Sequence, residues 1–261
     1  MIPLKIGDSI VNIKSSYHEL SYDEFQALLK ADTIYQKLSC ISDAEEEVFK
    51  NIKEEDILPF IEWLAYEIKP DKDIQSIMVE DKIIDMPKDI KYLSFGQYRI
   101  AKGLVSEMSS TEKGFEEINF KLLEVILRPV YEGVYIYIHD ELKTKNFINK
   151  LKQVSYVELL SVFMRIVENM IQLINRESKF LYRKPDPKHI LAGVDKLGIF
   201  GDAYTIDKLT GNDITKINEL MNMEYEEVFM KMWRDVYMND YEKRLEKIYH
   251  NERTNNNQGR Y

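Results

Sequence analysis

The amino-acid sequence predicts a mainly helical fold, with small β-hairpin elements on a helical body and a long helix at the C-terminus. Four Ser-x-x-Glu or Ser-x-x-Gln boxes stand directly before apolar patterns of helical spacing, and such boxes are typical of helix N-termini. A few short stretches instead alternate apolar and polar residues, as strands do. With 261 residues, of which 44% are hydrophobic, the chain has enough apolar side chains to bury a core.

Strand patterns occur at the N-terminus and in the middle of the chain. Residues 2–13 alternate around Gly7-Asp8, which predicts a two-stranded hairpin. Residues 74–86 are rich in Ile, Met and Val and predict a second hairpin that turns near Asp81. A further β segment is expected over residues 134–138, which read Val-Tyr-Ile-Tyr-Ile.

The capping boxes place the helix starts. In each box a serine side chain accepts a hydrogen bond from a free backbone N–H, and an acid or amide reaches back to the serine. Gly96 lies inside one such first turn, where a glycine lets a neighbouring backbone come close, although capping by Ser94 and Gln97 alone is the other explanation of this box. The boxes are Ser21-Tyr-Asp-Glu24, Ser42-Asp-Ala-Glu45, Ser94-Phe-Gly-Gln97 and Ser155-Tyr-Val-Glu158. The helical patterns cover residues 21–30, 42–53, 55–68, 95–108, 115–127, 140–152, 156–181, 213–221 and 224–252.

Prolines mark the expected breaks. Arg128-Pro129 is expected to end the 115–127 helix, because proline lacks the backbone donor that a helix interior needs. Lys184-Pro-Asp-Pro187 is the strongest interruption, because the residue before each proline favours extended backbone. We therefore expect a helical domain over residues 1–182 and, over residues 183–261, a loop-rich segment followed by a long helix and a polar tail. No internal repeat is apparent.

The charge of the chain is uneven. It carries 36 basic and 45 acidic side chains, a net charge of −9. Residues 19–81 hold 6 Lys and no Arg against 17 Asp and Glu, so this segment alone carries 6 − 17 = −11. Such an acidic lobe repels phosphate backbones, and we expect no nucleic-acid ligand there. A host-directed protein that mimics DNA charge through this lobe is one alternative function.

Several features indicate a protein that stays inside the cell. Cys40 is the single cysteine, so an intramolecular disulfide and paired-thiolate zinc sites are excluded. The N-terminus alternates like a strand and lacks the apolar core of a secretory signal. The longest apolar stretch, residues 159–174, contains Arg165 and Glu168, so no membrane helix is expected.

No motif in the sequence points to catalysis or cofactor binding. Neither GxGxxG nor GxxxxGK[ST] occurs, so no phosphate-cradling loop is expected. The four histidines are solitary, whereas a helical zinc hydrolase needs two of them one turn apart. We expect no enzyme activity, no cofactor and no metal. The alternative is a metal-assisted hydrolase whose loop would present Asp186, His189, Asp195 and Asp202, although acids beside Pro and Gly are also ordinary turn residues.

Three stretches resemble a loose family of tailed-bacteriophage virion-assembly proteins. They are Lys91–Tyr98 (KYLSFGQY), Leu122–Pro129 (LLEVILRP) and Gly211–Met223 (GNDITKINELMNM), and the resemblance spans roughly residues 20–250. Members occur in crAss-like and other Bacteroidetes phages and are described as virion structural proteins or tail assembly chaperones. The resemblance implies a portal, neck or tail protein, located in the virion or, during assembly, in the host cytoplasm. It implies contacts with other phage structural proteins or copies of itself, and it supplies no active-site residues.

The C-terminal helix is the candidate interface. Its aromatic residues recur at helical spacing over residues 224–252, and a stripe of this kind needs to be covered. Packing within the same subunit is one explanation, and contact with a neighbouring subunit is the other. We expect part of the stripe to bury against a neighbour, with the polar tail laid along it. The candidate residues are Tyr225, Phe229, Trp233, Tyr237, Asn255, Asn256, Asn257 and Tyr261.

Overall fold

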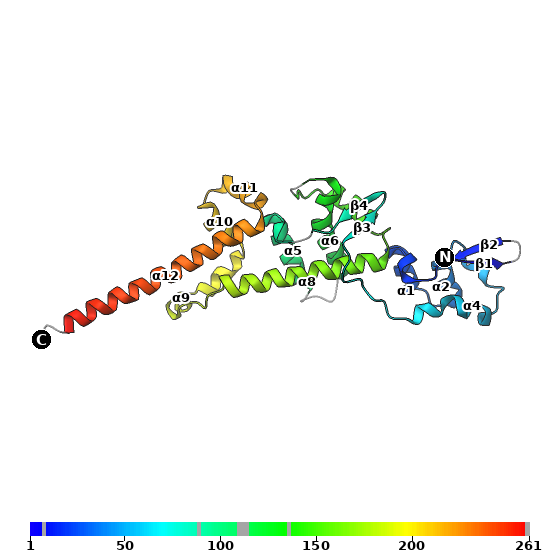
Figure 1. Cartoon of the computed structure of the whole chain (residues 1–261), viewed down its shortest axis with the longest axis horizontal. Helices are drawn as coiled ribbons and strands as arrows, with labels where there is room; N and C mark the ends of the chain where they lie inside the picture. The colour runs from blue at the N-terminus through cyan, green and yellow to red at the C-terminus, as the bar shows by residue number, and fades with distance from the viewer. Residues whose placement is uncertain (7–8, 88–89, 109–114, 135–136, 259–261) are drawn as a thin grey trace. The chain divides into compact units, whose positions relative to one another are not determined.

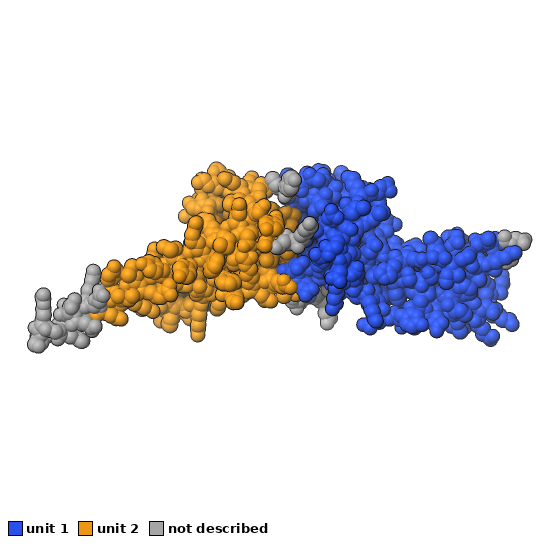
Figure 2. All heavy atoms as spheres, in the orientation of Figure 1, with its two compact units in different colours: residues 1–88, 103–169 blue, residues 89–102, 170–261 orange. Residues whose placement is uncertain are grey.

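The computed structural model describes residues 1–6, 9–87, 90–108, 115–134 and 137–258, and it confirms the mainly helical fold with two small antiparallel hairpins and a long C-terminal helix (Figure 1). The chain divides into two compact units (Figure 2). Unit 1 comprises residues 1–88 and 103–169, and unit 2 comprises residues 89–102 and 170–261. One helix runs without a break from Tyr156 to Leu181 and contributes residues to both units, while the domain boundary expected at residue 182 stays a prediction.

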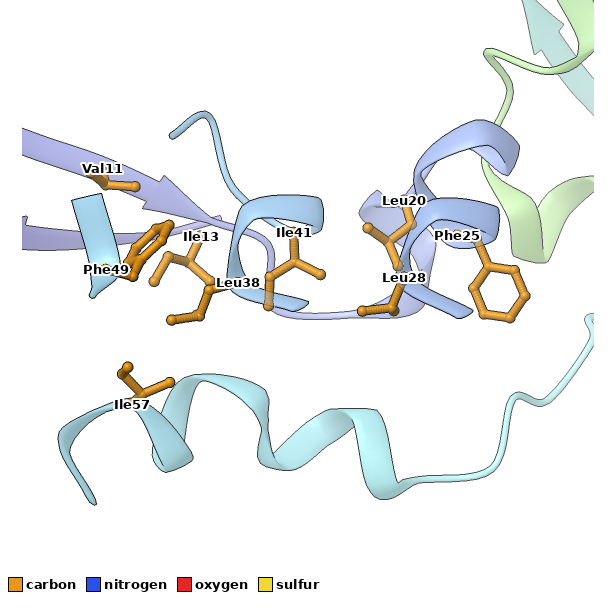
Figure 3. Packing of buried hydrophobic residues seen from close by; sticks show 9 residues of the cluster. All are labelled: Val11, Ile13, Leu20, Phe25, Leu28, Leu38, Ile41, Phe49 and Ile57. Atoms are coloured by element: carbon orange, nitrogen blue, oxygen red, sulfur yellow. The ribbon is translucent and has the colours of Figure 1, made fainter. Parts of the chain in front are cut away.

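The N-terminal part of unit 1 has its own apolar cluster. Strands β1 (Ile2–Ile6) and β2 (Ser9–Ile13) pair as the expected hairpin; the Gly7-Asp8 turn lies outside the described residues. The strands are followed by α1 (Tyr22–Leu29), α2 (Ile34–Cys40), α3 (Glu46–Phe49) and α4 (Glu54–Ile61). The cluster that joins them consists of Val11, Ile13, Leu20, Phe25, Leu28, Leu38, Ile41, Phe49 and Ile57 (Figure 3).

The rest of unit 1 consists of a second hairpin and longer helices. Strands β3 (Ser76–Val79) and β4 (Lys82–Asp85) pair around Glu80-Asp81, which confirms the predicted turn. Helices α6 (Phe115–Glu132) and α7 (Glu141–Leu151) follow, together with the first part of α8 (Tyr156–Leu181).

The described part of unit 2 holds parts of two α-helices, four whole α-helices and three short 3-10 helices. It holds the start of α5 (Phe95–Met108) and the end of α8. The whole α-helices are α9 (Pro187–Leu191), α10 (Ala203–Thr210), α11 (Ile217–Asn222) and α12 (Tyr225–Gln258). Two of them, α9 and α10, lie in the stretch that the sequence predicted to be mostly loop.

Two of the four predicted capping boxes form. Glu24 N donates to Ser21 Oγ at 3.3 Å and Ser21 N donates back to Glu24 Oε2 at 2.8 Å. The Ser94–Gln97 box forms in the same way, with both bonds at 3.2 Å. The other two predictions are wrong. Ser42 accepts from Ala44 N and α3 begins only at Glu46, while the Ser155 hydroxyl has no partner although α8 begins where expected.

The glycine prediction is also confirmed. A Cβ built on Gly96 would lie 3.1 Å from the Met221 carbonyl oxygen, tighter than most real contacts of a Cβ. Glycine at this position therefore lets the first turn of α5 approach the backbone at the end of α11.

The predictions around Pro129 are wrong. Helix α6 continues through Pro129 to Glu132, and the described residues of the 134–138 segment are not in a strand. The missing backbone bond costs about 3 kcal/mol. The buried Arg128 side chain makes bonds on both sides of this point: it donates to Glu124 and to Glu132, one turn on either side, and to the Ile138 carbonyl at 2.6 Å.

In unit 1 the starts of α1 and α8 are hydrogen-bonded to each other. Tyr22 N donates to Val154 O at 3.2 Å, and Tyr156 N donates to Leu20 O at 2.8 Å. The side chains of Phe25 and Tyr156 also stack on each other, with ring centroids 3.7 Å apart. Antiparallel bonds and a ring stack thus fix the two helix N-termini side by side.

Unit 2 contains the same arrangement at the starts of α5 and α12. Phe95 N donates to Met223 O at 2.7 Å, and Tyr225 N donates to Leu93 O at 2.8 Å. The Tyr98 and Tyr225 rings stack with centroids 3.8 Å apart. The stacked rings hold the same positions relative to the helix starts as their counterparts in unit 1.

The chain therefore contains an internal repeat, and the expectation of none was wrong. The four segments are residues 20–25 (LSYDEF), 93–98 (LSFGQY), 154–159 (VSYVEL) and 223–228 (MEYEEV). They share an apolar residue, a Ser or Glu and an aromatic residue in succession, followed two positions later by Glu or Gln. The motif covers too few residues to stand out in a sequence, and it becomes recognisable from the backbone pairing.

Candidate interaction surface

The N-terminal half of α12 is held firmly within unit 2. Its first residue, Tyr225, is 0% exposed and stacks on Tyr98, which is 1% exposed. Neither tyrosine hydroxyl has a hydrogen-bond partner of good geometry. The Glu177 carboxylate lies close enough to act on both hydroxyls and is paired with the Lys102 ammonium at 2.5 Å.

These two tyrosines are held in their neutral form. Burial, and then the nearby Glu177 carboxylate, raise the pKa of both the Tyr98 and the Tyr225 hydroxyl above the usual tyrosine range. A raised pKa in the folded state stabilises the fold fully below the unfolded-state pKa of about 10, and this stabilisation is lost as the pH rises above that value.

We therefore expect an alkaline loss of stability that depends on these hydroxyls. Above pH about 10, each buried tyrosine should lower the free energy of unfolding by about 1.4 kcal/mol per pH unit. In Tyr98→Phe this slope should be shallower, with little change at pH 7, as measured by urea unfolding at a series of pH values. Tyr241→Phe removes an exposed hydroxyl from α12, the helix that carries Tyr225, and should leave the slope unchanged. Equal slopes in all three proteins would contradict the assignment.

Further contacts hold α12 against the end of α8. Arg176 makes a two-pronged ion pair with Glu226, at 2.6 and 2.7 Å. The same guanidinium lies 3.9 Å from the centroid of the Phe229 ring. The Phe180 ring packs edge-on against Phe229 and Trp233. One more ion pair joins Arg183 to Asp240 at 2.8 Å, so these contacts extend along α12 as far as Asp240.

Beyond Asp240 the character of α12 changes. None of the residues 241–251 is buried, although several are large and apolar. Met238 and Tyr241 are each 48% exposed, Ile248 is 54% exposed, and Leu245 is partly exposed. We call these four residues the α12 stripe. Tyr237 and Tyr249 flank it and are also exposed.

The α12 stripe lies on the opposite side of the helix from the buried face. At about 3.6 residues per turn, Tyr225, Phe229 and Val236 share one side of α12. Tyr241 and Leu245 lie about half a turn away from that side. The apolar face therefore changes sides along the helix, which packing on a single domain does not require. In the described part of α12, the first half thus packs in unit 2, and the stripe on the second half is at least partly exposed.

The candidate interface residues named from the sequence differ in their exposure. Tyr225 and Phe229 lie in the core of unit 2, where they are not available to a neighbour in this structure. Trp233 is half-buried beside Phe180, and Tyr237 is 59% exposed. The helix includes residues 255–257, but their side chains, like the whole of Tyr261, lie outside the described part of the chain.

The stripe residues Met238, Leu245 and Ile248 were missed as interface candidates. The signal that identifies them is spacing, because the members of the stripe follow one another at three, four and three residues. Only one of the four stripe residues, Tyr241, is aromatic, so a stripe defined by aromatic residues alone does not include the others.

The alternative hydrolase residues are not brought together. Asp186 caps α9 by accepting from Lys188 N at 2.9 Å, and Asp202 pairs with Arg99 at 3.1 Å. Asp195 lies in the first turn of a 3-10 helix (Val194–Phe200), and His189 lies within α9. Among the described residues, no three His, Cys, Asp or Glu side chains are grouped so that they could hold a metal ion.

Comparisons with family models, curated proteins and solved structures find no match for this chain. Within the described ranges, every helix is too short or too polar to cross a membrane.

Proposed function

We propose that this chain is a virion structural or assembly protein of a tailed bacteriophage, from the portal, neck or tail region, which works through protein–protein contacts and without catalysis. The observation that carries the proposal is the α12 stripe, an apolar surface on a helix that is anchored at one end. Apolar side chains gathered on one exposed helix face are typical of binding surfaces, because covering them removes apolar area from water. The resemblance of three stretches to phage assembly proteins supports the same proposal and supplies the class of partner.

The anchoring of α12 supports a contact role in physical terms. A rigid helix that already has its bound conformation loses little conformational entropy when a partner covers it. The contacts of Tyr225, Phe229 and Asp240 hold the first half of α12, and the second half continues the same helix. The stripe is thus presented in a fixed conformation.

The proposal is tested by the composition of purified particles. The protein should be present in fixed stoichiometry in particles, or in assembly intermediates, as measured by quantitative mass spectrometry. The double variant Tyr241→Glu/Leu245→Glu should be absent from them, because it places two charges on the stripe. Lys243→Glu changes a charge on the other side of the same turns and should be incorporated normally. Normal incorporation of the double variant would contradict the proposal.

Removal of the tail tests a second part of the proposal. Deletion of residues 253–261 should leave the melting temperature of the isolated protein almost unchanged and should weaken its incorporation. The deletion removes the polar end of α12, residues 253–258, and the three residues after it, and a neighbour laid along this segment would lose its contacts with them. A clearly lower melting temperature would instead assign the tail to the fold of its own subunit. Normal assembly would show that the tail has no part in the interface.

A further inference from the structure

We infer that the α12 stripe pairs with the α12 stripe of a second copy of this chain, as a short parallel coiled coil. This inference rests on the proposed function and names its partner. Met238, Tyr241, Leu245 and Ile248 follow the three-four-three spacing of heptad positions a, d, a and d. All four lie within the continuous helix Tyr225–Gln258 and are at least partly exposed, so both heptads are preformed.

The flanking residues determine the orientation of the pair. In this register the g positions are Tyr237 and Arg244, and the e positions are Glu242 and Tyr249. In a parallel pair each g residue lies beside the e residue five positions further along the other helix. Arg244 then meets Tyr249 of the second copy, a cation against an aromatic ring. Tyr237 meets Glu242 of the second copy, a hydroxyl donor beside a carboxylate.

An antiparallel pair is disfavoured by the same charges. If the two α12 helices run antiparallel with their stripes in contact, Met238 lies against Ile248 of the second copy and Tyr241 lies against Leu245. Glu242 would then face Glu242 of the second copy, and Arg244 would face Arg244. Like charges placed together destabilise such a pair, so this repulsion favours the parallel orientation, in which no like charges meet at these positions.

Two heptads form a weak interface on their own. Short isolated helices are marginal in water because nucleation is unfavourable. Here the helix already exists, since its first half is packed in unit 2. The contacts between the two stripes therefore have to offset only the entropy cost of bringing two chains together. We expect reversible self-association that becomes strong where many copies are held together, because linked contacts raise the effective concentration.

Sedimentation of the full chain over a range of concentrations tests the pairing. The protein should shift from monomer towards dimer or a higher oligomer as its concentration rises. Leu245→Glu should raise the dissociation constant at least tenfold, roughly 1.4 kcal/mol. Lys243→Glu, on the opposite side of the same turn, should leave it within about twofold. A chain that stays monomeric at every concentration, or equal association of both variants, would overturn the inference.

Disulfide trapping tests the orientation. With Cys40 replaced by serine, oxidised Ile248→Cys should form a covalent dimer, because the two copies of this residue meet in a parallel pair. In the antiparallel pair these residues would lie about 15 Å apart along the axis, at 1.5 Å per residue. A mixture of Met238→Cys and Ile248→Cys chains would then give the crosslinked heterodimer instead, which would overturn the parallel assignment.

Failure of this inference is distinguishable from failure of the proposed function. If the chain is monomeric but Tyr241→Glu/Leu245→Glu is still lost from particles, the stripe binds a different protein, and only the pairing is wrong. If the double variant is incorporated normally, the stripe has no role in assembly, and both are wrong.

Discussion

Replacement of Arg128 by leucine is expected to lower the free energy of unfolding by about 3–5 kcal/mol, the usual cost of breaking a buried ion pair from one side. Arg128 and Glu124 are almost completely buried and paired with each other. The Glu124 carboxylate also accepts from the Tyr137 hydroxyl at 2.9 Å and from the Thr144 hydroxyl at 3.0 Å. Burial, and then this carboxylate, raise the pKa of Tyr137 to about 12. Without the guanidinium, the buried Glu124 carboxylate would lose the cation that pairs with it.

The double variant Glu124→Leu/Arg128→Leu is the control for this prediction. It removes both charges, so it should recover most of the lost stability, because a well-packed apolar pair often replaces a buried ion pair at little cost. Chemical denaturation of the three proteins at pH 7 measures both effects. A loss below about 1 kcal/mol in Arg128→Leu, within the range of an ordinary exposed ion pair, would contradict the account of this cluster.

Replacement of Phe229 by alanine should cost about 3–5 kcal/mol, the usual range for a buried aromatic residue. Phe229 is 1% exposed and lies between the Arg176 guanidinium, Phe180 and Tyr225. Its loss would remove the ring that joins the start of α12 to the end of α8. Tyr237→Ala is the matched control, since this exposed residue lies two turns further along the same helix and should cost less than about 0.5 kcal/mol. Equal effects from both substitutions would contradict the assignment of Phe229 to the core.

The local elements were predictable from the sequence where a few neighbouring residues determine them. The Ser21 and Ser94 boxes and the hairpin around Glu80-Asp81 formed as expected, because each depends on short-range hydrogen bonds. Ser155 shows the limit of this reasoning. Its helix starts at the predicted place, but the backbone pairing with Leu20 and the ring stack on Tyr156 fix that start without the hydroxyl.

The errors arise where distant residues override a local preference. Helix α6 continues through Pro129, and the Arg128 side chain there bonds to Glu124 and Glu132 on the neighbouring turns, a set of contacts that the local pattern around Pro129 does not predict. The internal repeat was missed for a related reason. Its segments are six residues long and lie far apart in the sequence. Their correspondence becomes visible in the backbone hydrogen bonds, which pair the start of α1 with that of α8 and the start of α5 with that of α12.

The burial of the candidate interface residues was only partly predictable. The sequence did not show that Tyr225 and Phe229 lie in the core of unit 2, because aromatic spacing alone does not tell which side of a helix a core will cover. Helical geometry separates the two faces once the buried side is known. The α12 stripe then follows from the spacing of Met238, Tyr241, Leu245 and Ile248.

We expect the second half of α12 to serve a partner and not the fold of its own subunit. A chain that ends at Asp240 tests this most directly, because it keeps the ion pair with Arg183 and removes most of the α12 stripe. Its melting temperature should lie within about 2 °C of that of the full chain, a shift that corresponds to less than about 1 kcal/mol for a protein of this size. Its incorporation into particles should be lost. A melting temperature lower by more than about 5 °C, or normal incorporation, would contradict the claim.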